Sequence, residues 1–319
     1  MDTLKALHCF VRAVELGSLS AVARESGSSQ PTVSKTMAAL ERQVGAQLLI
    51  RSTTRVQPTE QGRRFYEHAR QTLESYAEGV SQARGETEQV RGRLRVSAPV
   101  SLGVLRLNAL LLEFMQLHPD VEVELLLNDR FVDLTEEGID LALRLGGELP
   151  EQLIARPLAR SPRYLVAAPA WISRVPALNS PEDLPPADYL RFAWLDAGQN
   201  LLLRHADGRE LSLATRSRYT ANSSLAIRES YCLGAGFGLT PAWLVADLLA
   251  DGSLQRLLAD WRGPAQEASL LYPSRRFLPA RTRALIDFLI ERLPHLPGFE
   301  PCERPARFPV QCSDYAFRH

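Results

Sequence analysis

The chain has 319 residues, of which 45% are hydrophobic and 23% are charged, and its formal net charge is zero. Its length allows two or three domains with ample cores, and its composition is that of a soluble globular protein. Overall charge gives no sign of nucleic-acid binding, and the apolar runs are too short or too interrupted to predict a secretory signal or a membrane span. We therefore expect a cytoplasmic protein with no membrane partner.

The N-terminal stretch has the pattern of a helix-turn-helix. A first amphipathic helix ends near Gly17. Its apolar positions are Leu4, Leu7, Phe10, Val11 and Val14. Residues 21–23 predict a compact second helix, and Gly27 suits the turn after it because glycine tolerates left-handed backbone angles. Ser29 is a predicted N-cap, and Pro31 falls in the first turn of a third helix, where its missing N–H is not needed.

The third helix is predicted to have an apolar back and a short polar front. The apolar positions at helical spacing, which should face inward, are Val33, Met37 and Leu40. Thr32, Ser34 and Lys35 then point outward, and a helix of this kind fits the DNA major groove. The alternative is an ordinary helical pair whose polar residues are only solvated, which the spacing alone does not exclude.

A short basic segment, 51–56, predicts a wing after the third helix. Its Arg55 would lie along phosphates or in a minor groove, unless the segment is a hairpin whose arginines are merely solvated. Between Arg24 and Arg70 the chain has eight basic and four acidic residues. This local surplus of positive charge favours nucleic-acid binding by the N-terminal region.

A long helix should follow, capped by Thr59 and running to about Glu88. Its apolar stripe consists of Phe65, Ala69, Thr72, Tyr76, Val80 and Ala83. About 30 helical residues would span roughly 45 Å, and so long a helix with one narrow stripe normally buries it against a partner helix. We interpret it as both linker and dimer seam; the alternative is a helix packed on the other domain of its own chain.

From Arg93 onward the pattern changes to alternating strands and helices. The predicted strands are 93–98, 121–127, 140–145, 154–158, 164–168, 201–205, 209–213, 218–221, 236–240 and 267–272, and the predicted helices are 105–117, those starting near 222–224 and at 241, and 280–293. Asp207-Gly208 predicts a hairpin, and Arg160-Ser161-Pro162 a connection between two strands. The alternation implies open, mainly parallel sheets covered on both faces.

The sequence contains no pattern of catalytic or metal-binding residues. The six histidines and the four cysteines (Cys9, Cys232, Cys302 and Cys312) lack metal or disulfide spacing. Cys9 and Cys232 should be small core residues, with a redox-sensing thiol as the alternative. The glycine cluster 234–238 precedes a strand, which is the wrong order for a dinucleotide site. Asp129, Asp133 and Glu136-Glu137 should form a solvated face, so we expect no enzyme, metal or cofactor.

Two sets of residues carry a resemblance to a known family. In the N-terminal third they are Phe10, residues 21–24, the Ser-Gln-Pro-Thr-Val-Ser-Lys run of 29–35, Leu40-Glu41, Gly45, Leu48, Arg51 and 59–62. Further along they are 93–99, Asp133-Leu134, 138–142 and 234–238. Over about residues 2–293 the chain resembles the LysR-type transcriptional regulators. It departs from the family pattern at Leu19, Leu49, Ser26 and Ser28, and in its C-terminal tail.

The resemblance implies an N-terminal all-α winged helix-turn-helix with a long linker helix, and a C-terminal α/β effector domain of two lobes like the periplasmic binding proteins. The expected domains are 1–58 (DNA-binding), 59–90 (linker and dimerisation) and 91–293 (effector-binding, with lobe one as 91–161 and 266–293 and lobe two as 162–265). The hinge would lie near Ser161-Pro162 and Gly263-Pro264. Five prolines and few aliphatic residues predict that the tail, 294–319, is extended or disordered.

The residues expected to bind DNA are Ser29, Gln30, Pro31, Thr32, Ser34, Lys35, Arg51 and Arg55. Gln30 would read an adenine edge and Thr32 a thymine methyl, whereas Ser34, Lys35 and the two arginines would contact phosphates. The resemblance also implies a dimer or tetramer on promoter DNA, and it allows a contact with RNA polymerase. The rival functions are a solute-binding protein, against which the basic N-terminal domain argues, and an effector-independent repressor.

Three predicted strand ends run into helix N-termini, at 100–102, 222–224 and 240–241. Ligands of open α/β sheets bind beyond such ends, and the free N–H groups there favour a carboxylate. The expected effector-binding residues are Val100, Ser101, Leu102, Arg144, Asn222, Ser223, Thr240 and Pro241. We expect a small anionic metabolite; the alternative is that these residues are ordinary helix caps.

Overall fold

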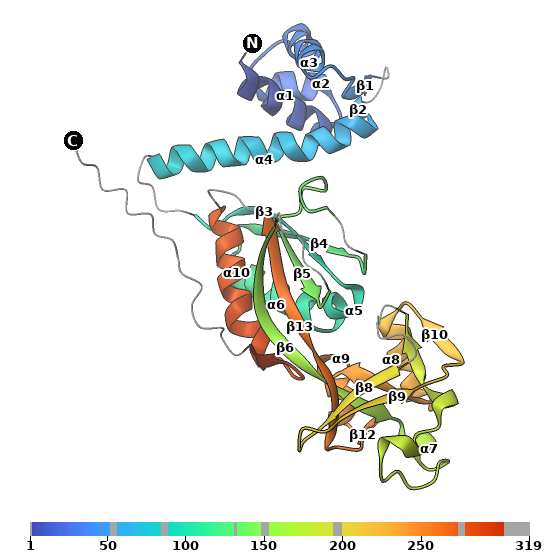
Figure 1. Ribbon diagram of the computed structural model, residues 1–319. Helices are drawn as coiled ribbons and strands as arrows, with labels where there is room; N and C mark the ends of the chain where they lie inside the picture. Colours follow the sequence, from blue (N-terminus) through green and yellow to red (C-terminus); the bar gives the residue numbers. More distant parts are fainter. Residues whose placement is uncertain are drawn as a thin grey trace, which may run out of the picture.

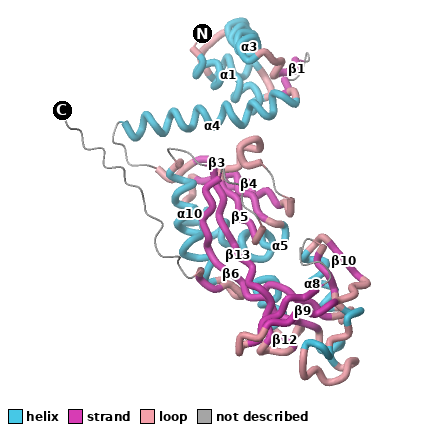
Figure 2. Tube along the Cα trace, in the orientation of Figure 1, coloured by secondary structure: helices cyan, strands magenta, loops and turns pink. Residues whose placement is uncertain are grey.

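The computed structural model describes residues 2–51, 56–83, 89–130, 133–147, 153–193, 200–273 and 278–302. A small helical domain lies at the N-terminal end, the long helix α4 lies beside it, and a larger α/β domain follows (Figure 1). Figure 2 shows helices on the sheet of this larger domain and a second group of strands at its far end. We call the part built from the helices and strands within 92–145 and 280–292 lobe one, and the part built from those within 169–257 lobe two.

The N-terminal domain is a three-helix unit with a two-stranded wing. Its elements are α1 (Thr3–Leu16), α2 (Leu19–Glu25), α3 (Gln30–Val44), β1 (Leu49–Arg51) and β2 (Val56–Pro58). Gly17 ends α1 at φ 61°, and Gly27 makes the helix-turn-helix turn at φ 60°, both in the left-handed region. Val33, Met37 and Leu40 are buried, so the predicted winged helix-turn-helix is confirmed.

The linker helix α4 (Glu60–Ala83) begins against the wing. Thr59 caps it, because its Oγ1 accepts a hydrogen bond from the N–H of Gly62 at 2.9 Å. The apolar stripe starts inside the N-terminal core, where Phe65 packs on Phe10 with ring centroids 5.5 Å apart. Further along, Tyr76 is 58% exposed, so this part of the stripe is open to solvent. Residues 84–88 of the predicted helix lie outside the described residues.

The main sheet is mixed rather than mainly parallel. It contains β3 (Gly92–Ala98), β4 (Val121–Leu127), β5 (Leu141–Leu145), β6 (Leu153–Ala167), β11 (Phe237–Pro241), β12 (Gln255–Leu257) and β13 (Trp261–Pro273). Among the strands that the structure describes in this sheet, the pairs β3–β4 and β3–β5 are parallel. The pairs β5–β13, β13–β6 and β6–β11 are antiparallel. The prediction was wrong because β6 and β13 are long antiparallel strands that run through both lobes (Figure 1).

The two short strands expected at 154–158 and 164–168 are one strand, β6. Pro162 suggested a connection there because proline cannot donate a ladder hydrogen bond. The pairing with β13 shifts register between Gly263 and Gln266, opposite this proline, so no donor is required at that point. The predicted hinge segments therefore lie inside two continuous strands.

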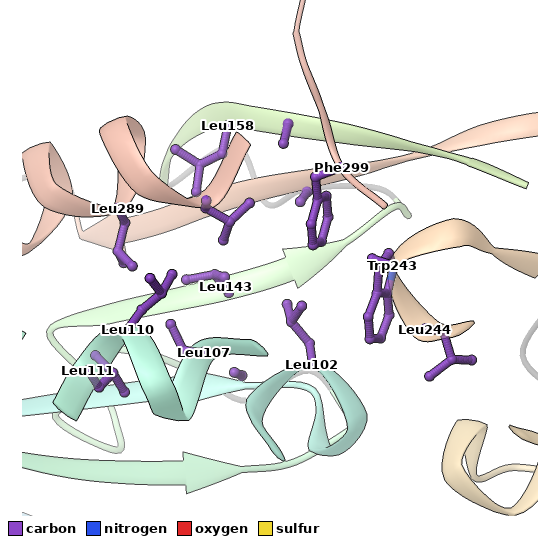
Figure 3. Packing of buried hydrophobic residues seen from close by; sticks show 14 of the residues in the cluster. Leu102, Leu107, Leu110, Leu111, Leu143, Leu158, Trp243, Leu244, Leu289 and Phe299 are labelled. Carbon is purple, nitrogen blue, oxygen red and sulfur yellow. The ribbon is translucent and has the colours of Figure 1, made fainter. Parts of the chain in front are cut away.

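Helices of lobe one cover this sheet. They are α5 (Val100–Leu102), a π-helical segment (Gly103–Leu107), α6 (Asn108–Leu117) and α10 (Ala280–Arg292). Leu102, Leu107, Leu110 and Leu289 converge on Leu143 of β5 in the core (Figure 3). Among the described residues, the continuous helix of 100–117 is apolar and long enough to fit across a membrane by composition. Its place here is that of a helix packed on a core, because Leu102, Leu107, Leu110, Leu111 and Phe114 on one of its faces are buried against the sheet.

Lobe two is built from short elements. They are α7 (Pro169–Ile172), the 3₁₀ turns 181–183 and 186–188, β7 (Leu190–Phe192), β8 (Asn200–His205), β9 (Glu210–Ala214), β10 (Tyr219–Ala221), α8 (Ser224–Cys232) and α9 (Ala242–Ala250). Strands β8 and β9 form the predicted hairpin around Gly208. Trp171, Tyr189 and Phe237 centre a second core.

Residues 294–302 are ordered, which corrects the expectation of an extended or disordered tail for this part. They form a 3₁₀ turn (Leu293–His295) and β14 (Glu300–Pro301), which pairs with β6. Phe299 is only 8% exposed and stacks on Trp243, with ring centroids 6.1 Å apart. Figure 3 shows this contact. One aromatic residue thus anchors a stretch of proline-rich composition, and residues 303–319 lie outside the described residues.

Candidate functional site

The predicted DNA-binding face is formed by the first turns of α3. The Ser29 hydroxyl accepts a hydrogen bond from the N–H of Thr32 at 3.3 Å and lies 2.8 Å from the Thr32 hydroxyl, so the cap is made as expected. Gln30, Pro31 and Thr32 are exposed, as is Lys35 one turn later. Since the opposite side of α3 is buried in the domain core, this polar front faces away from the protein.

Other predicted DNA contacts are placed differently. Ser34 is half-buried beside the exposed front. Arg51 is the last residue of β1, where its backbone pairs with Val56. The structure describes the backbone of Arg51 but not its side chain. Arg55 falls outside the described residues altogether.

A cavity of about 490 Å³ lies between the lobes. Lobe one contributes Pro99, Ser101, Asp129 and residues 145–147, while β6, β13 and lobe two contribute Arg163, Phe192, Ser224, Ile227, Tyr231, Leu239, Thr240, Pro241, Trp243, Leu244 and Gln266. Its size and its largely apolar wall with a few polar groups are those of a small-molecule site.

Only part of the predicted effector set lines this cavity, namely Ser101, Thr240 and Pro241. Leu102 instead points into the core of lobe one and is fully buried. Arg144 is also buried, and its Nη2 donates to the Ser97 hydroxyl at 3.2 Å. Leu102 lies on helix α5 and Arg144 lies within strand β5, and both side chains are buried in lobe one rather than open to the cavity.

The remaining predicted effector residues, Val100, Asn222 and Ser223, are not part of the lining but lie within two residues of Ser101 or Ser224, which are. Ser223 is the N-cap of α8, and its hydroxyl accepts a hydrogen bond from the Ala226 N–H at 3.3 Å. Asn222 precedes Ser223 and is exposed, while Ser224, which follows Ser223, reaches the lining. The N–H of Val100 at the start of α5 donates to Asp129 Oδ1 at 3.0 Å. The ordinary-cap alternative therefore describes Ser223 well.

Sequence reasoning missed the residues that hold the cavity wall together. The Trp243 indole N–H donates to Gln266 Oε1 at 2.9 Å, and its backbone N–H donates to the Ser161 hydroxyl at 3.1 Å. The Ser161 hydroxyl in turn donates to the carbonyl of Gly298 at 2.7 Å. These bonds join β6, β13, α9 and the 294–302 segment, which are distant in sequence, so no local pattern announces them.

Two charged residues of the lining were also missed. Arg163 lies inside β6, where the sequence pattern suggested a break, and Asp129 was assigned to a solvated acidic run. No local pattern singled out Arg163, because it becomes part of the lining only once β6 runs on past Pro162 beside β11 and β13. Burial lowers the pKa of the Arg163 guanidinium, against a smaller opposing effect of Tyr189.

The charged face of α4 docks on lobe one of its own chain. Glu67 pairs with Arg95 of β3 at 3.3 Å, and Glu74 pairs with Arg281 of α10. Between them, Arg70 pairs with Glu74 at 2.7 Å and with Glu67 at 3.6 Å. Burial lowers the pKa of Arg70, but the two carboxylates outweigh burial and the net shift is upward. Buried ion pairs of this kind fix geometry even where they add little stability.

The alternative proposed for α4 thus holds for its charged face, while Thr72 and Tyr76 of its apolar stripe are exposed. Gly138 of lobe one, at φ 63°, lets α4 approach closely, since a Cβ there would lie 3.0 Å from the Cβ of Glu67. At 100° per residue, Thr72 and Tyr76 lie on the side of α4 opposite Arg70 and Glu74. The two faces of the linker helix are therefore available for different contacts.

Comparisons with known proteins agree with this arrangement. Residues 4–63 match the model for bacterial regulatory helix-turn-helix proteins of the lysR family, and residues 87–294 match the LysR substrate binding domain. The chain is 33% identical to the transcriptional regulator PtxR of Pseudomonas aeruginosa over 93% of this chain and 94% of the relative. It is 30% identical to LtrA, a probable regulator of Klebsiella pneumoniae, over 93% and 96%.

Solved structures of full-length regulators show the same architecture. The virulence activator AphB of Vibrio cholerae is 29% identical and has a TM-score of 0.56, with 90% of this chain and 98% of that chain covered. CrgA of Neisseria meningitidis is 27% identical, with a TM-score of 0.58 and coverage of 91% and 98%. The chain therefore belongs to the LysR-type family of transcriptional regulators, which are not enzymes but DNA-binding proteins with a helix-turn-helix domain and an effector-binding domain.

Proposed function

We propose that this regulator is cytoplasmic, binds promoter DNA as a dimer or tetramer through the front of α3, and responds to a small anionic metabolite in the interlobe cavity. The observation that carries the proposal is the exposed row of Gln30, Pro31, Thr32 and Lys35 on a helix whose back is buried. Footprinting upstream of neighbouring genes, with and without candidate metabolites, tests it. A protected site that changes with one metabolite is expected.

Specificity and affinity are assigned to different side chains. Gln30 reads an adenine edge and Thr32 a thymine methyl in the major groove. Ser34, Lys35, Arg51 and Arg55 contact phosphates, which gives affinity that depends on salt rather than on sequence. Ser29 and Pro31 position the first turn of α3 for these contacts.

The open stripe of α4 supports dimerisation. Thr72 and Tyr76 are exposed on the side of α4 that does not dock on lobe one, and a second copy of the helix would cover them. Two such dimers would make the tetramer, and RNA polymerase is a further partner that bound DNA would bring near.

Signal transfer from the cavity to DNA follows from the docking of α4. A ligand that contacts both lobes shifts their arrangement only if it binds one arrangement better than the other. Lobe one carries Arg95 and Arg281, which pair with the linker helix, so a movement of lobe one also moves α4. The spacing or bend of the bound DNA would change in consequence.

Lys35→Ala is expected to weaken binding to promoter and random duplexes alike, with the slope of log affinity against log salt falling by about 1. Fluorescence anisotropy titrations at several salt concentrations measure this. Lys5→Ala is the matched control, because it removes the same charge from the exposed surface of α1. Unchanged affinity of the Lys35 variant for both duplexes would contradict the phosphate contact.

A further inference from the structure

Arg163 is the cationic group that the cavity offers to a ligand. It lies where β6 passes between the lobes, paired with Pro241 of β11 and with Gly263 of β13. Its side chain lines the cavity, and its buried Nε has no hydrogen-bond partner among the described residues. A buried guanidinium with an unpaired N–H is stabilised most by a carboxylate. The planar guanidinium can donate two parallel hydrogen bonds to the two carboxylate oxygens.

Asp129 is an acidic residue of the cavity lining, contributed by lobe one. It is exposed, follows β4 in lobe one, and its Oδ1 accepts the N–H of Val100 at the start of the 100–117 helix. Burial lowers the pKa of the Arg144 guanidinium, and the negative charge of Asp129 opposes this with a smaller upward effect. In lobe one, the N-terminus of the 100–117 helix and Arg144 are the groups that would attract an anion. Both already interact with the carboxylate of Asp129.

The rest of the cavity wall is mostly apolar. Its apolar residues are Phe192, Ile227, Tyr231, Leu239, Trp243 and Leu244. The polar lining is supplied by hydroxyls such as those of Ser101 and Thr240, which accept or donate hydrogen bonds without charge. Such a wall stabilises a hydrocarbon or aromatic body rather than a highly charged molecule.

We propose that the effector is a small acid with one carboxylate and an apolar body, that Arg163 binds this carboxylate, and that Asp129 excludes acids with a second carboxylate. This inference rests on the proposed effector function of the interlobe cavity and narrows it to one chemical class. A second carboxylate reaching lobe one would meet the like charge of Asp129, which disfavours a charged group beside it. A monoacid places neutral atoms there instead.

Calorimetry on the full-length protein with matched acids tests the proposal. The probes are 3-phenylpropanoate and hexanoate, their dicarboxylate counterparts 3-(4-carboxyphenyl)propanoate and hexanedioate, and the neutral 3-phenylpropanamide. We expect at least one monoacid to bind, its diacid to bind at least tenfold more weakly, and Arg163→Gln to weaken the monoacid at least tenfold without changing any affinity for the amide.

Asp129→Asn gives the sharper test. It should reduce the difference in affinity between the monoacid and its diacid to under threefold, mainly because the diacid binds more tightly. Glu136→Gln is the matched control: it removes one exposed acidic charge from the same region of lobe one but does not line the cavity. Its monoacid-to-diacid ratio should equal that of the wild type.

Three results would overturn the proposal. The first is a diacid that binds the wild type as tightly as its monoacid, and the second is a monoacid-to-diacid affinity ratio that Asp129→Asn leaves unchanged. Either result would contradict the role of Asp129 but would remain compatible with an anionic effector. Absence of binding by all four acids would overturn the monoacid class and also the anionic effector itself. Promoter binding by the same samples tells this last failure apart from loss of the DNA-binding function.

Discussion

Phe299→Ala is expected to lower the free energy of unfolding of the effector domain by about 3–5 kcal/mol. Phe299 is buried and stacks on Trp243 with ring planes 5° apart. The preceding carbonyl, that of Gly298, accepts a hydrogen bond from the Ser161 hydroxyl, which also receives the Trp243 N–H. Truncation of the ring would therefore leave a cavity beside the residues that line the effector site.

Tryptophan fluorescence in a denaturant titration measures this effect cleanly. All four tryptophans of the chain fall within the effector domain, so the N-terminal domain does not contribute to the signal. Phe299→Leu is the control and should cost about 1 kcal/mol, because most of the apolar volume is kept. A Phe299→Ala variant as stable as the wild type would contradict the packing of residues 294–302.

Gly62→Ala is expected to destabilise the N-terminal domain by about 3 kcal/mol and to abolish promoter binding at ordinary concentrations. A Cβ at this position would lie 2.0 Å from the carbonyl oxygen of Leu48 and 3.2 Å from the Thr59 hydroxyl. The clashing oxygen belongs to the backbone of Leu48, which directly precedes the wing strand β1. Because a backbone atom cannot rotate away as a side chain can, α4 and the wing would have to move apart to relieve the clash.

The same helix supplies a matched control. Gly79 of α4 is exposed, and a Cβ there would meet nothing within 4 Å. Gly79→Ala should therefore stabilise the helix by about 0.5–1 kcal/mol and should not abolish promoter binding. Far-UV circular dichroism during thermal unfolding, together with duplex titrations, measures both variants. Equal behaviour of the two variants would mean that Gly62 is not a point of close approach.

The N-terminal domain was predictable because its determinants are local. Ser29 caps α3 through Thr32, three residues away, and the buried back of the helix follows from spacings of three and four residues. Gly27 takes the left-handed angle that the turn requires. Each of these features is decided within one or two turns of the chain, so the amino-acid order alone specifies them.

The effector domain was less predictable because long-range pairing decides it. Pro162 marks a strand end in isolation, yet β13 supplies a register shift opposite it and β6 continues. Phe299 lies in a proline-rich stretch whose composition is typical of disorder, yet its ring stacks on that of Trp243. Arg163 became a site residue only when β11 and β13 placed it beside the cavity. Composition and periodicity do not encode such pairings.

The most direct test of the central claim, that the front of α3 binds the duplex groove, compares the wild type with the Gln30→Ala, Thr32→Ala double variant. Both are titrated with promoter and random duplexes by fluorescence anisotropy, with tryptophan fluorescence confirming an intact effector domain. The wild type should prefer the promoter, and the variant should bind both duplexes with one similar, salt-dependent affinity. A variant that keeps the wild-type preference, or a wild-type protein that binds no duplex at low salt, would contradict the account.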